Sequence, residues 1–375
     1  MIKAEIVAHS ISPQGNELIS VLCTFPRIIL AEINTHRMLS KNTSSSRAIP
    51  LKKMIEAVEN DPFIPIAWQK EHTGMQGYEY LTGLDYDQCV FEWLEAKDRA
   101  VEQAEKFKEI KVTKQLVNRL LEPFMWTTML ITGSKEGWDN FFELRCPQYQ
   151  TPVSQTVEPQ KSWKDLINVH GNEQNIDHLY HHETDVIFKL QHNKGQAEIH
   201  MMALAEKIYD AMNESTPKQL QSGQWHVPFE NKIDLINWLD EVNDDGHLDG
   251  DLDEQDRLFE IDKVKISTAM AAHTSYTIVG GKPVKSYKKW IELHDKLVSY
   301  NPPHSSPMEH CARAMSDEEY YTFITGNFNQ EIEIDADGFI DISTHSNNSN
   351  SFGWCNNLKG FIPYRYLLET EGLRF

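Results

Sequence analysis

The chain has 375 residues, of which 40% are apolar and 25% charged, and its formal net charge is −20. This composition is typical of a folded globular protein with one elaborated domain or two ordinary ones. The negative charge argues against broad contact with nucleic acid or an anionic membrane, but it leaves room for a local basic pocket. We therefore expect a small-molecule partner, no nucleic acid and no membrane.

The sequence shows no targeting or membrane-spanning segment. It has no basic start followed by an apolar core, and its longest apolar stretch, residues 18–33, is interrupted by Arg27 and Glu32. These features predict a cytoplasmic protein. The cysteines are odd in number and far apart, which indicates neither a disulfide framework nor a cysteine zinc site. They are Cys23, Cys89, Cys146, Cys311 and Cys355.

The first predicted elements are a strand and a helix. Residues 17–25 alternate between apolar and other side chains, which predicts a half-buried strand. Its buried face would hold Ile19, Val21, Cys23 and Phe25. After Pro26 the spacing is helical and places His36 and Arg37 at the end of a helix. The serine-rich stretch that follows is expected to be a loop.

Four further helices are predicted before residue 146, the first from Pro50 to about residue 59. Residues 86–109 form a long amphipathic pattern, and residues 135–145 form a shorter one that ends at Arg145. Between them, the pattern of KQLVNRLLE predicts a helix with Arg119 at the edge of its apolar stripe. The apolar stripes would contain Val90, Phe91, Leu94, Val101, Ala104 and Phe107 in the long helix and Leu116, Val117, Leu120 and Leu121 in KQLVNRLLE.

The rest of the chain alternates between polar segments and clear helices. Residues 146–190 are weakly periodic and are interpreted as an insertion, whereas residues 195–212 are clearly helical. The fold class expected is α+β, a mixed central sheet with flanking helices. The predicted organisation is a nucleotide- and flavin-binding core over 1–240, an acidic linker over 241–260 and a segment over 261–375 that completes the same catalytic domain. EIEIDADGFIDI predicts a hairpin near the C-terminus.

Four arginines at element ends or edges suit an anionic ligand, because guanidinium groups bind phosphates and planar carbonyl edges through paired hydrogen bonds. They are Arg37, Arg47, Arg119 and Arg145. Hydroxyls beside them, including Ser45, would complete a phosphate cradle, although each arginine could equally pair with a surface acid and the serines could form an ordinary loop. His178, His181 and His182 lack a clear fourth ligand, so we expect no metal site.

The stretch HRMLSKNTSSSR resembles the signature R-H-R-x-x-S-x-N-E-x-S-x-R of flavin-dependent thymidylate synthases. Six of its eight fixed positions agree, and Thr35 and Thr43 stand at the other two. Further landmarks are NRLLEP, WDNFFELR and GQAEI, which follow in the family's order. The segment HSSPMEH resembles H-x-S-P-x-E-H of the family, where it precedes the signature instead of following it. The resemblance therefore implies a circularly permuted form of that fold, of a kind typical of bacteriophages, with the host cytoplasm as its location.

This resemblance implies reductive methylation of dUMP to dTMP, with the one-carbon unit from 5,10-methylenetetrahydrofolate and reducing equivalents from NADPH through FAD. It implies a homotetramer. By position, Arg145 would stabilise charge on the pyrimidine, and Ser45 matches a serine once considered a nucleophile, here assigned to positioning. The nucleotide would be bound by Arg47, Ser45, Arg119 and Arg145. FAD would be bound by His36, Arg37, Asn140, His304, Ser306 and Glu309.

Two alternatives remain open. Thr35, Thr43 and Glu32, which stands where the family often has glutamine, also suit a 5-hydroxymethyltransferase acting on dUMP or dCMP. From another class, the chain could be a catalytically silent flavin- or nucleotide-binding protein, because a fold does not guarantee an activity.

Overall fold

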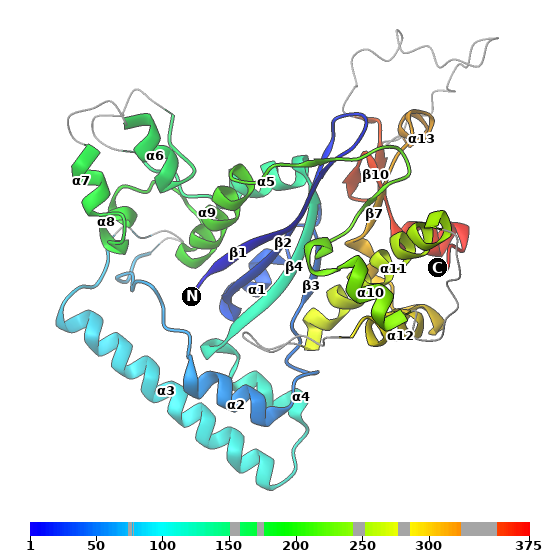
Figure 1. Ribbon diagram of the computed structural model, residues 1–375. Helices are drawn as coiled ribbons and strands as arrows, with labels where there is room; N and C mark the ends of the chain where they lie inside the picture. The colour runs from blue at the N-terminus through cyan, green and yellow to red at the C-terminus, as the bar shows by residue number, and fades with distance from the viewer. Residues whose placement is uncertain are drawn as a thin grey trace.

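The computed structural model describes residues 1–73, 77, 79–150, 158–170, 176–242, 252–276, 286–323 and 351–375. Its centre is a five-stranded mixed sheet with the order β3-β4-β2-β1-β5 (Figure 1). All neighbouring strands are antiparallel except β1 and β5. The strands are β1 Lys3–Ile11, β2 Glu17–Pro26, β3 Ser40–Thr43, β4 Trp126–Ser134 and β5 Lys218–Gln219. The expected fold class, a mixed sheet with flanking helices, is therefore confirmed.

One face of the sheet is covered by α5 (Lys135–Arg145) and α9 (Ile199–Asn213). The predicted buried face of β2 is confirmed, since each of its four side chains is fully buried against these helices. The predicted helix 135–145 coincides with α5, and Trp138, Phe141 and Phe142 pack inward from it. Strong apolar periodicity explains why this helix was predictable.

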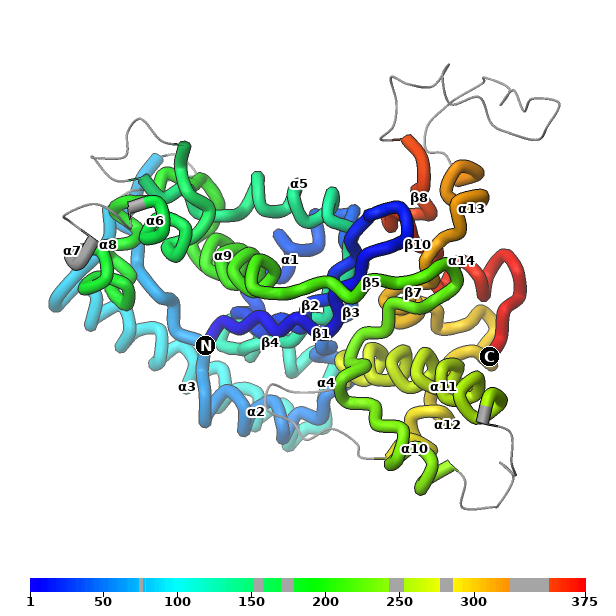
Figure 2. The backbone as a smooth tube through the Cα atoms, turned by 45° about the horizontal axis from the view of Figure 1, so that its top comes forward, coloured from blue at the N-terminus to red at the C-terminus, as the bar shows by residue number. Residues whose placement is uncertain are grey.

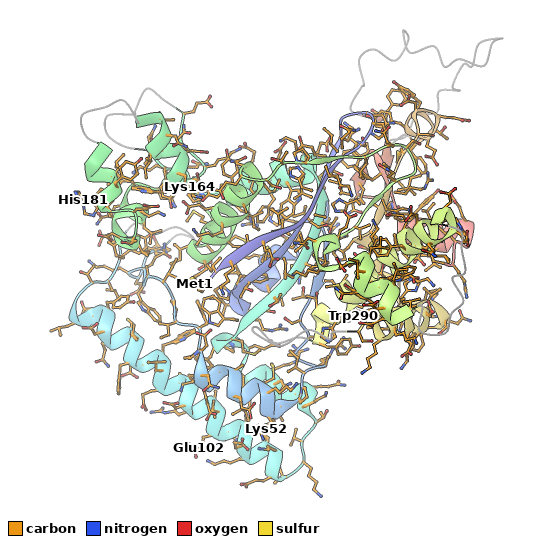
Figure 3. All side chains as sticks on the ribbon, viewed as in Figure 1. Met1, Lys52, Glu102, Lys164, His181 and Trp290 are labelled. Carbon is orange, nitrogen blue, oxygen red and sulfur yellow. The ribbon has the colours of Figure 1, made fainter. Side chains whose placement is uncertain are left out.

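The C-terminal part covers the opposite face. It contains α10 (Leu235–Val242), α11 (Leu252–His273), α12 (Tyr287–Ser299) and a second sheet in the order β10-β7-β6. The strands of this sheet are β6 Trp225–His226, β7 Ala312–Ala314 and β10 Phe361–Pro363. Figure 2 shows α11 and α12 lying together on the side away from α5 and α9. Trp290 of α12 is buried between these helices (Figure 3).

The remaining helices and short strands are as follows. They are α1 Leu30–Ile33, α2 Leu51–Asn60, α3 Leu84–Glu109, α4 Lys114–Val117, α6 Trp163–His170, α7 Ile176–His181, α8 Val186–Gln191, α13 Asp317–Thr322, α14 Tyr364–Tyr366, β8 Trp354–Cys355 and β9 Leu358–Lys359. Figure 3 labels Lys52 on α2 and Glu102 on α3, at the edge of the molecule away from the sheet. Among the residues that the structure describes, no helix is long and apolar enough to cross a bilayer.

Several predicted boundaries and buried residues were wrong. The helix expected after Pro26 is a 3-10 turn over 27–29 followed by the four-residue α1, so His36 and Arg37 lie beyond it. KQLVNRLLE forms only α4 and a 3-10 turn, and Leu116 and Leu120 are exposed, as is Phe91 of α3. These side chains have helical spacing, but they lie outside the cluster in which Val101, Val117 and Leu121 pack against α2.

Helices are also present within the two polar segments. The expected insertion 146–190 contains α6, α7 and α8, and the ends of the expected acidic linker belong to α10 and α11. The hairpin predicted from EIEIDADGFIDI lies outside the described residues. Short helices such as α6, α7 and α8 are stabilised mainly by tertiary packing, which a weakly periodic sequence does not reveal.

A line of buried polar side chains joins the two halves of the molecule. Thr132 Oγ1 lies 2.8 Å from His310 Nδ1 and 2.6 Å from Ser20 Oγ, which lies 2.9 Å from His226 Nε2. His226 Nδ1 in turn lies 2.9 Å from Ser10 Oγ. All five residues are buried. Because unpaired polar groups are costly in the interior, this line fixes how the C-terminal part sits on β1, β2 and β4.

The two histidines of this line should make the folded protein less stable at acidic pH. Burial lowers the pKa of His226 and of His310 to about 3, from an ordinary value of 6.5. Below pH 6.5 the unfolded chain therefore binds protons that the folded chain does not. The free energy of unfolding should fall by about 1.4 kcal/mol per pH unit for each histidine until pH approaches the folded pKa. Urea unfolding between pH 6.5 and pH 5 measures this slope.

His310→Gln removes one of the two imidazoles. The free energy of unfolding should therefore fall less steeply with decreasing pH, by the contribution of one histidine, about 1.4 kcal/mol per pH unit. The matched control is His304→Gln, because His304 is exposed. An unchanged slope in His310→Gln would contradict the assignment of His310 as a neutral buried imidazole.

Candidate functional site

Arg145 and His36 meet where the ends of α5 and α1 come together. The Arg145 Nε–H donates to His36 Nε2 at 3.0 Å, and the His36 ring lies edge-on to Phe141, with ring centroids 4.9 Å apart. Burial, together with the smaller effects of the positive charges of Arg145 and Lys41, lowers the pKa of His36 to about 4. His36 is therefore neutral at pH 7 and can accept the Arg145 hydrogen bond, which fixes the guanidinium.

Arg145 lines a cavity of about 370 Å³. The cavity lies between the end of α5, the start of α9 and the chain around residue 77, and Glu32 and Glu198 line it together with Arg145. Its other lining residues are Gln69, Gly77, Tyr80, Asn193, Gly195, Gln196, Ala197 and Met202. A guanidinium, two carboxylates and several amides in one cavity can recognise a ring that both donates and accepts hydrogen bonds.

Glu198 is held in place by the helix that it caps. Its Oε2 accepts from the backbone N–H groups of His200 and Met201 at 2.8 and 3.0 Å, and its Oε1 lies 2.5 Å from His200 Nδ1. Ile66 N–H donates to His200 Nε2 at 3.0 Å, so the His200 proton lies on Nδ1 and points to Glu198. Both Glu198 oxygens are thus used internally. The sequence does not mark His200 as a site residue, because its only feature there is a position within the helical stretch 195–212.

Glu32 is the carboxylate of the cavity that can still bind a ligand. Its Oε2 lies 3.5 Å from Arg145 Nη1, and its side chain is 40% exposed. Burial raises the pKa of Glu32, as does the nearby Glu198 charge, whereas Arg145 lowers it. Arg145 and Glu32 together present a donor next to an acceptor at the cavity wall.

The predicted phosphate-binding residues lie in another part of the fold. Arg47 and Arg119 are exposed, and Arg119 Nη1 lies 3.9 Å from Glu122. The two come from neighbouring segments, because Asn118 Nδ2 donates to the carbonyl oxygens of Ser46 and Ile49 at 2.5 and 3.0 Å. No contact within the described ranges joins either arginine to Arg145. Of the predicted site residues that the structure describes, only His36 therefore contacts Arg145.

Ser45 lies at the junction with the C-terminal part. Its backbone N–H donates to the Ser275 carbonyl at 2.9 Å, and its own carbonyl accepts from the N–H groups of Ala48 and Ile49. These bonds close a turn that leaves Arg47 exposed. The serine-rich loop was thus predicted correctly only after residue 43, because residues 40–43 form β3.

The remaining predicted flavin-binding residues are at the surface. Arg37, Asn140, His304 and Ser306 are exposed, and Glu309 is half-buried in an ion pair with Arg365. A Cβ at Gly137, one turn before Asn140, would lie 3.2 Å from the Met38 carbonyl oxygen, so the loop after His36 passes close to α5. Burial lowers the pKa of Lys41, and the nearby Glu309 carboxylate only partly offsets this effect.

These surface residues fit the edge of a large polar cofactor. Within the described parts of the chain, the side chains of Arg37, Asn140 and Ser306 form no hydrogen bond or ion pair, so their donors are available to a ligand. Guanidinium, amide and hydroxyl groups are suited to phosphate and ring-edge contacts. No group of three or more potential metal ligands is present in the described residues.

Comparison with known proteins gives only distant structural likeness. No family model matches the chain, and no curated protein matches it. Among solved structures, it is similar to a UMP/dUMP methylase PolB from Streptomyces cacaoi bound with 5-Br dUMP, with 14% identity and a TM-score of 0.33 over 43% of this chain and 84% of that chain. The same enzyme bound with 5-Br UMP gives 17% identity and a TM-score of 0.33 over 43% and 82%.

The Arg145–His36 contact predicts a measurable coupling. Arg145→Gln removes the positive charge beside the imidazole, so the pKa of His36 should rise towards its ordinary value, although burial continues to lower it. An NMR titration of the histidine ring signals measures the shift.

Arg257→Gln is the matched control, because Arg257 lies on α11 and pairs with Glu254 at the surface. A His36 pKa that is the same in Arg145→Gln as in the unsubstituted protein would contradict the contact.

Proposed function

We propose that the chain is a circularly permuted flavin-dependent thymidylate synthase that converts dUMP to dTMP with methylenetetrahydrofolate and NADPH. The observation that carries the proposal is the Arg145–His36 hydrogen bond at the cavity with Glu32. It joins the HR of the signature-like stretch to the arginine of WDNFFELR, more than a hundred residues later. Two of the stretches that resemble the family thus contribute to one site.

Contacts of the C-terminal part support the permutation. Asn42 Nδ2 donates to the Ala271 carbonyl at 2.5 Å, and Ser45 N–H donates to the Ser275 carbonyl. His310 of HSSPMEH bonds Thr132 in the neighbouring strand β4. Residues that would precede the signature in the family thus pack directly against it, as a permuted chain requires.

In the proposed reaction the protein binds and orients, whereas FAD and the folate would supply hydride and one-carbon transfer. Arg37, Asn140, His304, Ser306 and Glu309 would hold FAD, with other subunits of a homotetramer completing the site. Arg47, Arg119 and Ser45 would bind the nucleotide phosphate. Arg145 would donate to a pyrimidine carbonyl and stabilise negative charge on the ring as C5 becomes nucleophilic. Neutral His36 would keep that guanidinium in position.

The direct test is anaerobic turnover of the purified protein with FAD, NADPH and methylenetetrahydrofolate, offered dUMP or dCMP and followed by mass spectrometry of the nucleotide. We expect dUMP to gain a methyl group. Bound flavin without any product would favour the catalytically silent binder instead.

Arg145→Ala should abolish turnover, with a decrease in kcat/KM of about a hundredfold or more, because the developing negative charge loses its donor. Flavin absorbance of the purified variant should be unchanged. Arg257→Ala is the control for loss of a surface arginine. Rapid dTMP formation by Arg145→Ala would contradict the role of Arg145.

Glu32 favours the second candidate, 5-hydroxymethylation of dCMP or dUMP. An ionised carboxylate can only accept hydrogen bonds, which suits the amino group of cytosine, whereas an amide can also donate to a uracil carbonyl. Glu32 lies beside Arg145 at the cavity wall and retains acceptor capacity. The product mass in the turnover assay separates a methyl from a hydroxymethyl group.

If Glu32 contacts the ring edge, Glu32→Gln should move the ratio of kcat/KM values for dCMP and dUMP towards dUMP by about tenfold. Parallel initial rates with each nucleotide measure this ratio. Glu254→Gln on α11 is the control for removing a surface carboxylate. The same ratio in Glu32→Gln as in the unsubstituted protein would show that Glu32 does not select the base.

A further inference from the structure

The two carboxylates that line the Arg145 cavity are held in different ways. Glu198 accepts three hydrogen bonds, from the backbone N–H groups of His200 and Met201 and from the His200 ring. Among the described residues, the Glu32 carboxylate of α1 has one ionic partner, with 3.5 Å between its Oε2 and Arg145 Nη1. Because two nearby negative charges repel each other, the less restrained carboxylate takes up a proton more readily. In this cavity that carboxylate is Glu32.

The charge of Glu198 persists because its side-chain partner is neutral. Ile66 N–H donates to His200 Nε2 at 3.0 Å, so the ring proton is on Nδ1 and faces Glu198 Oε1. An imidazolium would carry N–H groups on both nitrogens and would lose the Ile66 bond. The His200 ring is also buried, edge-on to Phe63, with ring centroids 5.1 Å apart. His200 thus fixes Glu198 without cancelling its charge.

The start of α9 keeps Glu198 in place. Glu198 is the N-cap of this helix, where free backbone N–H groups and the helix dipole favour a negative charge. The helix is anchored by Met201 and Leu204, which are fully buried in the main core. The position of the Glu198 charge is therefore set by the core and not by a ligand.

Charged and titratable groups from five parts of the fold lie around Glu32. They are Arg145 at the end of α5, Glu198 at the start of α9, the neutral His36 after α1, Lys41 on β3 and Tyr80 before α3. Lys41 is engaged elsewhere, since its Nζ donates to the backbone carbonyl oxygens of Ile33 and His36. Burial and the Glu198 charge raise the pKa of Glu32, whereas Arg145 lowers it. Arg145 and Glu198 are therefore the charges that oppose each other at Glu32.

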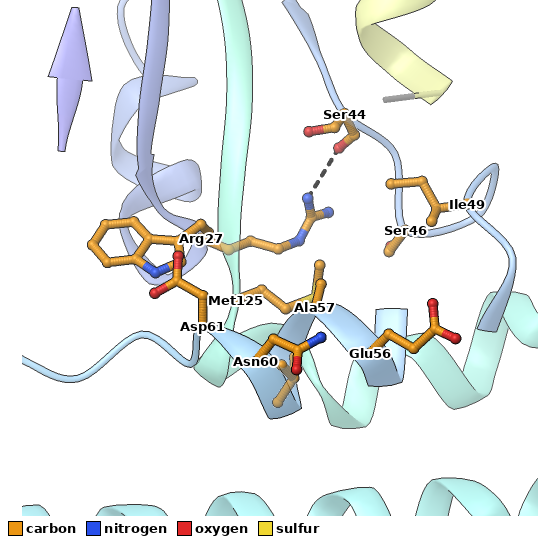
Figure 4. Close-up of a pocket in the computed structure, with 11 residues that line it drawn as sticks. Arg27, Ser44, Ser46, Ile49, Glu56, Ala57, Asn60, Asp61 and Met125 are labelled. Carbon is orange, nitrogen blue, oxygen red and sulfur yellow. Dashed lines mark hydrogen bonds between the residues drawn. The ribbon is translucent and has the colours of Figure 1, made fainter. Parts of the chain in front are cut away.

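A second cavity, of about 260 Å³, offers a comparison because its ion pair is part of the wall. It lies between α2, residues 44–49 and the start of β4 (Figure 4). Arg27 lines it, with Nη1 donating to the Ser44 carbonyl at 3.0 Å and Nη2 lying 3.2 Å from Glu122 Oε1. Glu122 is not among the residues that line this cavity, whereas Glu32 belongs to the lining of the Arg145 cavity. Only the Arg145 cavity thus offers the partner of its arginine to a ligand.

Protonated and ionised Glu32 suit different pyrimidines. A carboxylic acid donates a hydrogen bond, which suits the C4 carbonyl of uracil, whereas a carboxylate only accepts, which suits the amino group of cytosine. We propose that Glu198 is a positioning residue whose fixed charge shifts Glu32 towards the donor form, so that the cavity prefers uracil at low pH and cytosine at high pH. This inference rests on the proposed function, because it requires a pyrimidine nucleotide in the Arg145 cavity.

Isothermal titration of the full-length protein with dUMP and, separately, with dCMP measures this preference. We expect the ratio of the two affinities to move towards dUMP by about tenfold as the pH falls from about 8 to about 5, because protonated Glu32 gains a bond to uracil and loses one to cytosine. The phosphate titrates in both ligands, so it does not change the ratio. Glu32→Gln is the baseline, because any pH dependence that remains in this variant comes from the cytosine ring.

Glu198→Ser tests the role of the fixed charge, because serine can still cap α9 but carries no charge. Glu32 should then ionise more readily, and the midpoint of the affinity-ratio curve should move to lower pH by about half a unit. Glu198→Asp keeps both the cap and the charge, so its midpoint should stay near that of the unsubstituted protein. Glu56→Gln is the matched control, because it removes a carboxylate that lines the second cavity and should leave the midpoint unchanged.

The same pH dependence in Glu32→Gln as in the unsubstituted protein would overturn the inference. An unchanged midpoint in Glu198→Ser, with a native circular dichroism spectrum, would also overturn it. If Glu198→Ser does not fold, Glu198→Gln removes the same charge at nearly the same size and decides in its place.

The proposed function fails separately from this inference. A pH-dependent ratio that shifts in Glu198→Ser, together with no methylated or hydroxymethylated product in the turnover assay, would support the inference and contradict the proposed activity. No binding of either nucleotide at any pH would contradict both.

Discussion

The antiparallel ladder between β2 and β4 is the constraint on which the rest of the structure depends. It runs over nine residue pairs, from Leu18 opposite Ser134 to Pro26 opposite Trp126. Each strand leads directly into part of the site: β2 into the turn and α1 that carry Glu32 and His36, and β4 into α5, which ends at Arg145. A register shift of one residue would turn the buried side chains of the shifted strand to the other face of the sheet. The Arg145–His36 contact therefore follows from strand pairing more than 100 residues apart.

The two faces of this ladder are stabilised by different interactions. On the side of α5 and α9 the contact is apolar and tolerant of small shifts, whereas on the other side Ser20 and Thr132 bond to His226 and His310. Hydrogen bonds require particular distances, so the polar face fixes the position of the C-terminal part more strictly than apolar packing would.

Much of the central fold could be predicted from sequence, because its signals are local. The period of two in residues 17–25 and the helical period of 135–145 reflect burial on one face, and both elements formed as expected. The exposed Phe91, Leu116 and Leu120 show the limit of such patterns, since spacing gives a face but not what covers it. In the site, His36 and Arg145 were found through a resemblance to a family. His200 and the cavity with Arg27 were not, because they depend on the register of distant segments.

The serine-rich stretch shows how one short segment can serve two sides of a fold. From Asn42 to Ser46 the chain continues the alternation of β3: Asn42, Ser44 and Ser46 are buried, whereas Thr43 and Ser45 are half-buried. Ser44 and Ser46 line the cavity with Arg27, while the backbone N–H of Ser45 bonds to the C-terminal part and Arg47 is exposed. Small hydroxyl side chains are suited to both tasks, since they fit in a wall without filling the cavity beside it. The segment thus separates the inner cavity from the surface on which Arg47 and Arg119 lie.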